Sequence, residues 1–315
     1  MNRRNFLQTF GTGIMVTSVG AFPLRALAAE PEFIKLTILH TNDVHSRIEP
    51  FPMDGGRYQG LGGAARRAAL IEQVRATEEN VLLFDSGDIF QGTPYFNFYG
   101  GELEFKLMSE MRYDAATIGN HDFDAGIDGL YEQLPHANFP FISSNYDFSD
   151  TIMNGKTLPY KIFNIDKLKI GVLGVGIELE GLVPAALYQE TRYLDPIEQA
   201  NHTAAQLKGD EKCDYVICLS HLGYKYGNEP ERPSDVILAA RSKNIDLILG
   251  GHTDTFLDQP DVIANQDGKP VLINQVGWAG ILLGRLDIIF ERNRKNRCET
   301  CANIFVTMNA EGDNN

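Results

Sequence analysis

Five short segments of this 315-residue chain carry side chains at spacings that suit binding of a metal ion. The segments contain, in chain order, Asp43 and His45, then Asp88, then Asn120 with His121 and Asp124, then His221, and last His252 and Asp254. Carboxylate and imidazole groups are the ligands that proteins use for divalent ions such as Zn²⁺, Mn²⁺ and Mg²⁺. Each segment alone is commonplace as polar surface, but the five together predict one shared metal site.

Each of these segments follows an apolar run rich in β-branched residues, which predicts a strand ending at the polar residues. The predicted strands cover 36–41, 81–84, 115–118, 215–219 and 247–249. Apolar residues at helical spacing predict helices over 64–77, 103–111 and 196–207. A hairpin over 160–165 and 168–175 and strands over 271–275 and 281–290 complete the pattern. Strands that alternate with helices indicate a layered α/β fold, which binds ligands beyond the carboxyl ends of its strands.

Composition and charge limit the kinds of protein that this chain can be. Apolar residues make up 43% and charged residues 22%, which is typical of a globular protein and excludes a disordered or multi-span membrane chain. The 42 acidic residues exceed the 28 basic ones and give a net charge of -14. We therefore expect no nucleic acid polymer as a partner, because a phosphate backbone needs a basic face.

The first 28 residues have the order of regions expected of an export signal. Arg3 and Arg4 precede an apolar stretch, and Ala26 to Ala28 offer small residues for cleavage. This order resembles a twin-arginine signal peptide over 1–28, so we expect export to the periplasm or the extracellular space. The apolar stretch is too short to cross a bilayer, and we expect no membrane span after cleavage.

The motifs resemble those of the calcineurin-like metallophosphoesterases and, within them, the catalytic domain of the 5′-nucleotidases. The segment Ile-Leu-His-Thr-Asn-Asp-Val-His at 38–45 is typical of that branch, and the motifs extend over 36–290. The resemblance implies a four-layered α/β/β/α sandwich with mixed sheets. It implies one catalytic domain over 33–290, followed by a polar C-terminal tail over 291–315. The implied substrate is a nucleotide or another small phosphoester.

The resemblance also implies a role for each polar residue. It implies two divalent ions, the first bound by Asp43, His45 and Asp88, and the second by the bridging Asp88 together with Asn120, His221 and His252. His121, oriented by Asp124, would stabilise the charge on the transferred phosphoryl group or protonate the leaving oxygen.

Asp254 is the position at which the chain departs from that branch, which usually has histidine there. As an additional carboxylate, Asp254 would reduce the net positive charge of a two-metal site and favour the harder Mn²⁺ or Mg²⁺ over Zn²⁺. Aspartate is also shorter than histidine, so the first metal position would be weakly occupied if the carboxylate falls out of reach. The expected cofactors are therefore two divalent ions of the Zn, Mn or Mg class, with the harder ion favoured by Asp254.

Three functions agree with these motifs. The first is hydrolysis of nucleotide phosphomonoesters, with the nucleotidase C-terminal domain supplied by a separate chain, because 25 residues follow the last predicted strand. The second is a different hydrolysis at the same metals, of a cyclic nucleotide or a thiosulfate ester. The third is a non-catalytic metal-binding subunit of a complex.

The four cysteines divide into two pairs of different character. Cys213 and Cys218 lie on or next to a predicted strand, and we expect both in the core. Cys298 and Cys301 form an isolated C-x-x-C, which cannot build a four-cysteine zinc site by itself. In an exported protein this pair would form a small disulfide or remain as two thiols.

Overall fold

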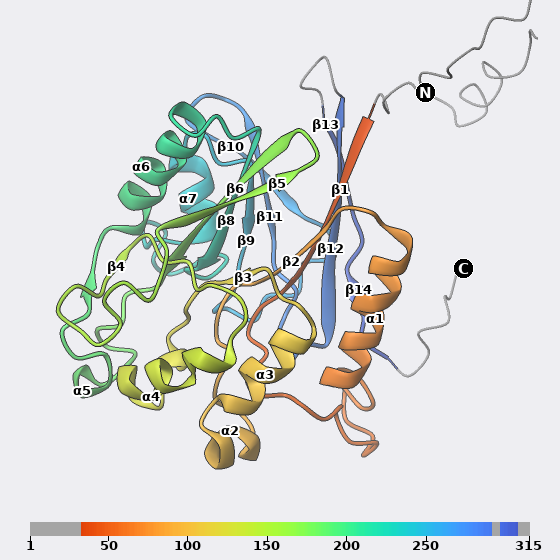
Figure 1. Ribbon diagram of the computed structural model, residues 1–315, viewed down its shortest axis with the longest axis vertical. Coiled ribbons are helices and arrows are strands. Elements are labelled where there is room, and N and C mark those ends of the chain that lie inside the picture. The colour runs from red at the N-terminus through yellow and green to blue at the C-terminus, as the bar shows by residue number, and fades with distance from the viewer. Residues whose placement is uncertain (1–32, 292–296, 308–315) are drawn as a thin grey trace, which may run out of the picture. The chain divides into compact units, whose positions relative to one another are not determined.

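Two six-stranded sheets form the centre of the structure (Figure 1). The computed structural model describes residues 33–291 and 297–307, and within 297–301 Thr300 alone has a described side chain. The first sheet contains β1 (Phe33–Thr41), β2 (Val81–Asp85), β3 (Ala115–Ala116), β12 (Leu282–Glu291), β13 (Arg297–Cys301) and β14 (Ile304–Phe305). Its order is β13-β12-β1-β2-β3, and β14 pairs with β12. β1 runs parallel to β2 and antiparallel to β12, so the sheet is mixed.

The second sheet has the order β10-β11-β9-β8-β6-β5. Its strands are β5 (Tyr160–Ile165), β6 (Leu168–Gly176), β8 (Tyr215–His221), β9 (Leu247–Leu249), β10 (Asp261–Ala264) and β11 (Pro270–Asn274). The four inner strands are parallel, whereas β5 and β10 run antiparallel to their neighbours at the two edges. The parallel strands bring their carboxyl ends to one edge, where β8 ends at His221.

Helices cover the outer faces of both sheets. The longer ones are α1 (Ala64–Thr77), α3 (Glu102–Glu110), α4 (Gly126–Gln133), α6 (Pro196–Gly209) and α7 (Asp235–Arg241). Shorter elements complete the chain: α2 (Pro94–Tyr99), α5 (Ala185–Tyr188), the 3₁₀ turns η1 (His121–Phe123) and η2 (Leu134–His136), and the pair β4 (Tyr146–Asp147) and β7 (Arg192–Tyr193). Figure 1 shows α1 on one side of the sheets and α6 and α7 on the other.

Three apolar clusters hold the four layers together. One lies between the sheets and includes Ile38 and Phe84 from the first sheet and Ile217 from the second. A second packs α1 and α3 against the outer face of the first sheet, and a third packs α6 and α7 against the second sheet. The predicted four-layered α/β/β/α sandwich with mixed sheets is therefore confirmed.

The local sequence accounts for where several elements begin. Pro196 is the first residue of α6, and the Asp195 side chain accepts hydrogen bonds from the first two available backbone N–H groups of that helix. The helix over 64–77 and the strand over 247–249 have the predicted bounds. The strand predicted over 115–118 is shorter, because its partner β2 ends at Asp85, opposite Ala116.

The segment predicted as a polar tail contributes two strands to the first sheet. β13 pairs with β12 through residues 297–301, and β14 pairs with the beginning of β12. Val306 is fully buried, and its carbonyl oxygen accepts a hydrogen bond from the Gly62 backbone. The expectation of a polar tail is therefore corrected for residues 297–306. Strand pairing uses backbone groups, so polar side chains do not prevent it. The apolar residues that end at Val306 fix this segment to the core.

Other predictions fall partly inside the described structure. Cys213 and Cys218 are buried free thiols in the core under α6, as predicted. The side chains of Cys298 and Cys301 lie outside the described part, as does the predicted signal peptide over 1–28. Among the helices that the structure describes, none is long and apolar enough to cross a membrane.

Candidate metal centre

The predicted ligands converge at the carboxyl edges of the two sheets. Asp43, His45 and Asp88 form one group, and their potential ligand atoms all lie within 4.8 Å of one another. Asp88, His221 and His252 form a second group that meets the same limit. Asp88 therefore belongs to both groups, and residues far apart in the sequence meet around one carboxylate.

The backbone at these positions is held in an uncommon conformation. φ is positive at Asp43 (50°), His45 (51°), Asp88 (56°) and His252 (73°), which is unfavourable for residues with a side chain. Hydrogen bonds between the first two loops maintain this conformation, from Asp43 N to Gly87 O (3.0 Å) and from His45 N to Asp88 O (3.1 Å). Backbone strain at several residues of one cluster is a common feature of functional sites.

The carboxylates are fixed by hydrogen bonds that leave an oxygen facing the other groups. Asp43 accepts hydrogen bonds from the Asn42 side chain (2.7 Å) and from the His252 backbone (2.9 Å). Asp88 Oδ1 accepts a hydrogen bond from the His121 backbone (2.8 Å). The second oxygen, Asp88 Oδ2, lies 3.1 Å from His221 Nε2 and 3.8 Å from the corresponding nitrogen of His45.

Backbone carbonyls orient two of the imidazoles. Nδ1 of His45 lies 3.2 Å from Phe90 O, and Nδ1 of His221 lies 2.7 Å from Ser86 O. A carbonyl can only accept, so Nδ1 carries the proton in both rings and Nε2 is the nitrogen directed at Asp88. His221 Nε2 is buried without an aligned hydrogen bond among the described atoms. Such a donor set, with one imidazole nitrogen unsatisfied, fits a divalent metal ion.

Burial and neighbouring charges shift the pKa values of these groups in opposite directions. Burial alone would lower the pKa of His221, but the Asp88 carboxylate raises it to about 10. The His221 charge in turn overcomes the burial of Asp88 and holds the pKa of that carboxyl well below its usual range. Burial raises the pKa of Asp43 and lowers the pKa of His252 to about 3. Asp88 and His221 thus stabilise each other's charged forms, whereas burial favours the neutral forms of Asp43 and His252.

Asn120 and His121 reach the same edge from the loop after β3. Asn120 Oδ1 lies 2.8 Å from His252 Nδ1, next to the second group. His121 Nδ1 lies 2.9 Å from Asp124 Oδ2, and this hydrogen bond raises the pKa of the imidazole although partial burial opposes it. The His121 ring packs edge-on against His45, with 5.2 Å between ring centroids. With 38% of its side chain exposed, His121 can meet a ligand that enters from solvent.

Asp254 lies outside both groups of potential ligands. Its φ of 51° resembles that of the metal-facing residues, but its side chain is exposed. Desolvation by the surrounding loops raises its pKa, and the nearby His45 opposes that shift. Asp254 thus lies near His45 without belonging to either group.

Asp122 holds the Asp88 loop, a role that sequence reasoning did not assign to it. Its fully buried carboxylate accepts hydrogen bonds from the backbone N–H groups of Asp88, Ile89, Phe90 and Gly119, at 2.8 to 3.1 Å. Burial raises its pKa to about 6, and these hydrogen bonds oppose the shift. In the sequence, Asp122 is noticeable only as an acidic residue between His121 and Asp124.

Gly119 allows the closest approach in the site. A Cβ atom at this residue would lie 2.2 Å from Asp88 Oδ1 and 2.7 Å from the His221 ring. Any side chain would therefore displace the carboxylate that both groups share.

Proteins of similar sequence and structure are 5′-nucleotidases about twice as long. Snake venom 5′-nucleotidase of Crotalus adamanteus is 38% identical over 289 residues, which cover 84% of this chain and 47% of the venom protein. The 5′-nucleotidase of Homo sapiens is 34% identical, covering 82% of this chain and 47% of its own. The crystal structure of a 5′-nucleotidase precursor from Thermus thermophilus matches with a TM-score of 0.77 at 32% identity, over 86% of this chain and 54% of that one. The chain thus spans about half the length of these relatives.

A family profile matches the part of the chain that carries the site. The profile described as calcineurin-like phosphoesterase covers residues 36–255, from β1 through Asp254. Proteins of this family use divalent metal ions, in agreement with the ligand groups around Asp88. Fold, motifs and profile agree, and the chain belongs to the calcineurin-like phosphoesterase family.

Proposed function

We propose that this chain hydrolyses phosphate monoesters, with nucleotides as the preferred substrates. The observation that carries the proposal is the pair of ligand groups that share Asp88, with His121 and Asp124 beside them. Sites with two neighbouring divalent ions are typical of enzymes that displace a group at phosphorus. The similarity to proteins named 5′-nucleotidase supports nucleotides as the substrate class.

In this proposal two divalent ions occupy the two groups. The first is held by Asp43, His45 and Asp88, and the second by Asp88, Asn120, His221 and His252. When bound, such ions act as Lewis acids toward phosphoryl oxygens and lower the pKa of water. The carbonyls of Ser86 and Phe90 keep the imidazoles of His221 and His45 in the orientation that presents Nε2.

His121 acts on the substrate side of the site. Its hydrogen bond to Asp124 fixes the ring and raises the pKa, so the imidazolium form is more favoured than in a free imidazole. That form donates a hydrogen bond from Nε2 to the phosphoryl group or passes a proton to the leaving oxygen. General acids of this kind contribute roughly a hundredfold to ten-thousandfold to rate.

A neighbouring cavity offers room for the organic part of the substrate. It has a volume of about 320 Å³ and is lined by Glu178, Tyr193 and Arg232 among others. Its lining residue Ile177 follows Gly176, which pairs with His221, and the charge of Arg232 acts on His252. The proposal places the leaving group here.

Asp254 bears on the choice of metal. We propose that its carboxylate reaches the first ion when the site is loaded and favours Mn²⁺ or Mg²⁺ over Zn²⁺. The change Asp254→His should then shift activity toward Zn²⁺, measured as the ratio of rates with the two metals. Two tightly held Zn²⁺ ions in protein purified from the native host would contradict this choice of metal.

The decisive experiment is a substrate panel on metal-free protein reloaded with Mn²⁺, Mg²⁺ or Zn²⁺. The panel contains AMP, a cyclic nucleotide, a thiosulfate ester and 4-nitrophenyl phosphate, each with and without a candidate chain that carries a nucleotidase C-terminal domain. Preferred hydrolysis of AMP supports the proposal. Preference for the cyclic nucleotide or the thiosulfate ester would replace it with that activity. Tight metal binding with no turnover under any condition would favour a non-catalytic metal-binding subunit.

We also propose that the protein is exported by the twin-arginine route. The order of charged, apolar and small residues over 1–28 supports this. Replacement of Arg3 and Arg4 by lysine should retain the protein in the cytoplasm, measured by fractionation of the expressing cells. Unchanged export of that variant would contradict the route.

A further inference from the structure

A second group of buried polar residues lies behind the loops that carry the metal ligands. Its members come from α1, α3, the ends of β1 and β2 and the segments that follow β1 and α3, and they are Thr41, Ser46, Arg67, Asp85, Glu104 and Tyr113. We call this group the Arg67 cluster. The charged members are almost fully buried, with exposed fractions of 3% for Arg67, 0% for Asp85 and 4% for Glu104. Buried charge is costly, so its placement here calls for an explanation.

Two of these acids hold the ligand loops from behind. Glu104 accepts a hydrogen bond from the Ser46 hydroxyl (2.5 Å), directly after His45. Asp85 accepts one from the Thr41 hydroxyl (2.6 Å) and another from the Gly87 backbone (2.9 Å). Both loops, 41–46 and 85–88, are thus held by hydrogen bonds to these two carboxylates.

Arg67 lines the same small cavity as these two acids and supplies the positive charge there. Its Nε and Nη1 atoms are buried without a hydrogen-bond partner among the described protein atoms, and so is Glu104 Oε2. A cavity that offers about 10 Å³ to the centre of a water molecule is lined by Arg67, Asp85 and Glu104. That is room for about one water, which needs two to four polar partners and finds them here. Gly280 leaves room for the guanidinium, since a Cβ there would lie 2.0 Å from Nη1.

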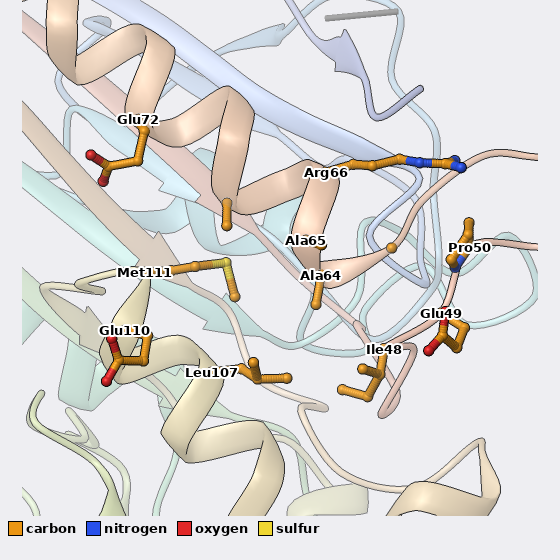
Figure 2. A pocket seen from close by; sticks show the side chains of 12 residues that line it. Ile48, Glu49, Pro50, Ala64, Ala65, Arg66, Glu72, Leu107, Glu110 and Met111 are labelled. Atoms are coloured by element: carbon orange, nitrogen blue, oxygen red, sulfur yellow. The ribbon is translucent and has the colours of Figure 1, made fainter. Parts of the chain in front are cut away.

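An open cleft between α1 and α3 lies next to the Arg67 cluster. Figure 2 shows this cleft, which has a volume of about 480 Å³, with Ile48, Leu107 and Met111 projecting into it. The same three residues also line the inner cavity. The Arg67 cluster is therefore closed off from the cleft by apolar side chains, which keep bulk water from competing for its hydrogen bonds.

We propose that Arg67 and Glu104 are positioning residues for the metal centre, acting through Ser46 and Asp85 on the loops that bear Asp43, His45 and Asp88. Arg67 balances the two carboxylates, and the carboxylates hold the strained loops in the conformation that directs ligand atoms toward one point. This inference rests on the proposed function, because it assumes that those loops bind metal. Loss of an outer partner of a metal ligand typically weakens metal binding by about 10- to 100-fold.

The test separates positioning from a contribution to folding alone. The variants are Arg67→Leu, Glu104→Leu and the double variant, each studied metal-free by thermal unfolding and by calorimetric titration with MnCl₂. Arg67→Leu leaves Asp85 and Glu104 buried without a cation and should lower Tm strongly, whereas Glu104→Leu leaves Arg67 with Asp85 alone and should lower Tm less. The double variant removes one of the two acids together with the cation, so its Tm should lie above that of Arg67→Leu. Its Mn²⁺ affinity should nevertheless stay about 10- to 100-fold below that of the unaltered protein, because Ser46 has lost its acceptor.

Two further variants complete the design. Glu104→Gln keeps an oxygen that accepts the Ser46 hydroxyl proton and should retain most of the Mn²⁺ affinity. Glu110→Leu, an exposed glutamate on the same helix, is the matched control and should leave both Tm and affinity unchanged. If the double variant fails to fold, Ser46→Ala decides the question, since it removes the same hydrogen bond without altering any charge.

The outcomes distinguish this inference from the proposed function. Recovery of both Tm and Mn²⁺ affinity in the double variant, or normal affinity in Ser46→Ala, would overturn the inference. Tight Mn²⁺ binding by the unaltered protein without hydrolysis of any ester would overturn the proposed function and leave the inference standing. Failure of the unaltered protein to bind Mn²⁺ would overturn both.

Discussion

The two ends of strand β1 carry clusters of charged residues that are balanced in different ways. At its amino-terminal end, Lys35 and Arg285 each contact both Glu78 and Asp287, at 2.5 to 3.2 Å. At its carboxyl end, Asp43 begins the loops in which carboxylates and imidazoles converge. The first cluster contains its own counter-charges, whereas the second, in the proposed function, takes up metal cations.

The pKa shifts express this difference. The hydrogen bond from Lys35 lowers the pKa of Glu78, with a further contribution from Arg285, so the ionised acid is favoured in the folded protein. Burial raises the pKa of Asp43, so ionisation of this acid is opposed in the folded protein without a cation. One set of charges is therefore satisfied within the fold, and the other fits the proposed metal site.

Removing the shared carboxylate should have the largest effect. In Asp88→Asn both ligand groups lose their common oxygen, and we expect metal binding to be abolished and activity to fall by more than the roughly 100-fold that loss of an outer partner causes. Metal content after reloading and the rate on 4-nitrophenyl phosphate measure this. Asp287→Asn at the balanced end is the control and should keep full activity. Normal metal content in Asp88→Asn would show that the two ligand groups do not share this residue.

Removing the histidine on the substrate side should lower turnover without loss of metal. We expect His121→Ala to reduce kcat by roughly a hundredfold to ten-thousandfold, the range of general acid catalysis, while metal content stays normal. His202→Ala, an exposed histidine on α6, is the matched control. Near-normal kcat in His121→Ala would exclude this residue from the chemistry.

Weakening the support of the Asp88 loop should have an intermediate effect. In Asp122→Asn one carboxylate oxygen becomes an amide that cannot accept from the backbone, so two of its hydrogen bonds are lost. We expect metal affinity to fall by about 10- to 100-fold, measured by titration of metal-free protein. Asp128→Asn, an exposed acid on α4, should leave the affinity unchanged. An unchanged affinity in Asp122→Asn would confine this carboxylate to folding.

The smallest effect should come from the balanced end, and it should depend on pH. The pKa of Glu78 is lowered in the folded state, so its ion pairs stabilise the protein above the unfolded-state value, and this stabilisation is lost as the pH falls through the folded-state value. We expect Glu78→Gln to cost about 1 kcal/mol or less at pH 7, a Tm decrease of roughly 2–4 °C at most. The difference from the unaltered protein should disappear in acid, and activity should not change.

Thermal unfolding of Glu78→Gln and of the unaltered protein across this pH range provides the measurement. Glu79→Gln, the exposed acid next along the chain, is the control. A Tm deficit that persisted in acid would show that packing of Glu78, and not its charge, is what stabilises the end of α1.

The spacing of apolar residues was sufficient to predict helices and strands that bury one face. The helix over 64–77 and the hairpin of β5 and β6 were predicted because their apolar spacing matches the period of the element. β13 and β14 were not predicted, because strand pairing there joins backbone groups and not side chains. Their pairing with β12 can be recognised only in the folded chain. The position of Asp122 was visible in the sequence, but its four hydrogen bonds join residues 3 to 34 positions away.

By itself the sequence determined which ligand types are present and that each follows a strand, because residue chemistry and hydrophobic periodicity are local properties. Asp43, His45, Asp88, His221 and His252 were all identified in this way, and the structure brings them together. Only the tertiary structure decided that Asp122 holds the Asp88 loop and that Ser46, next to His45, donates a hydrogen bond to Glu104. The distances between these groups depend on how the two sheets and their helices pack, and that packing cannot be read from the spacing of residues along the chain.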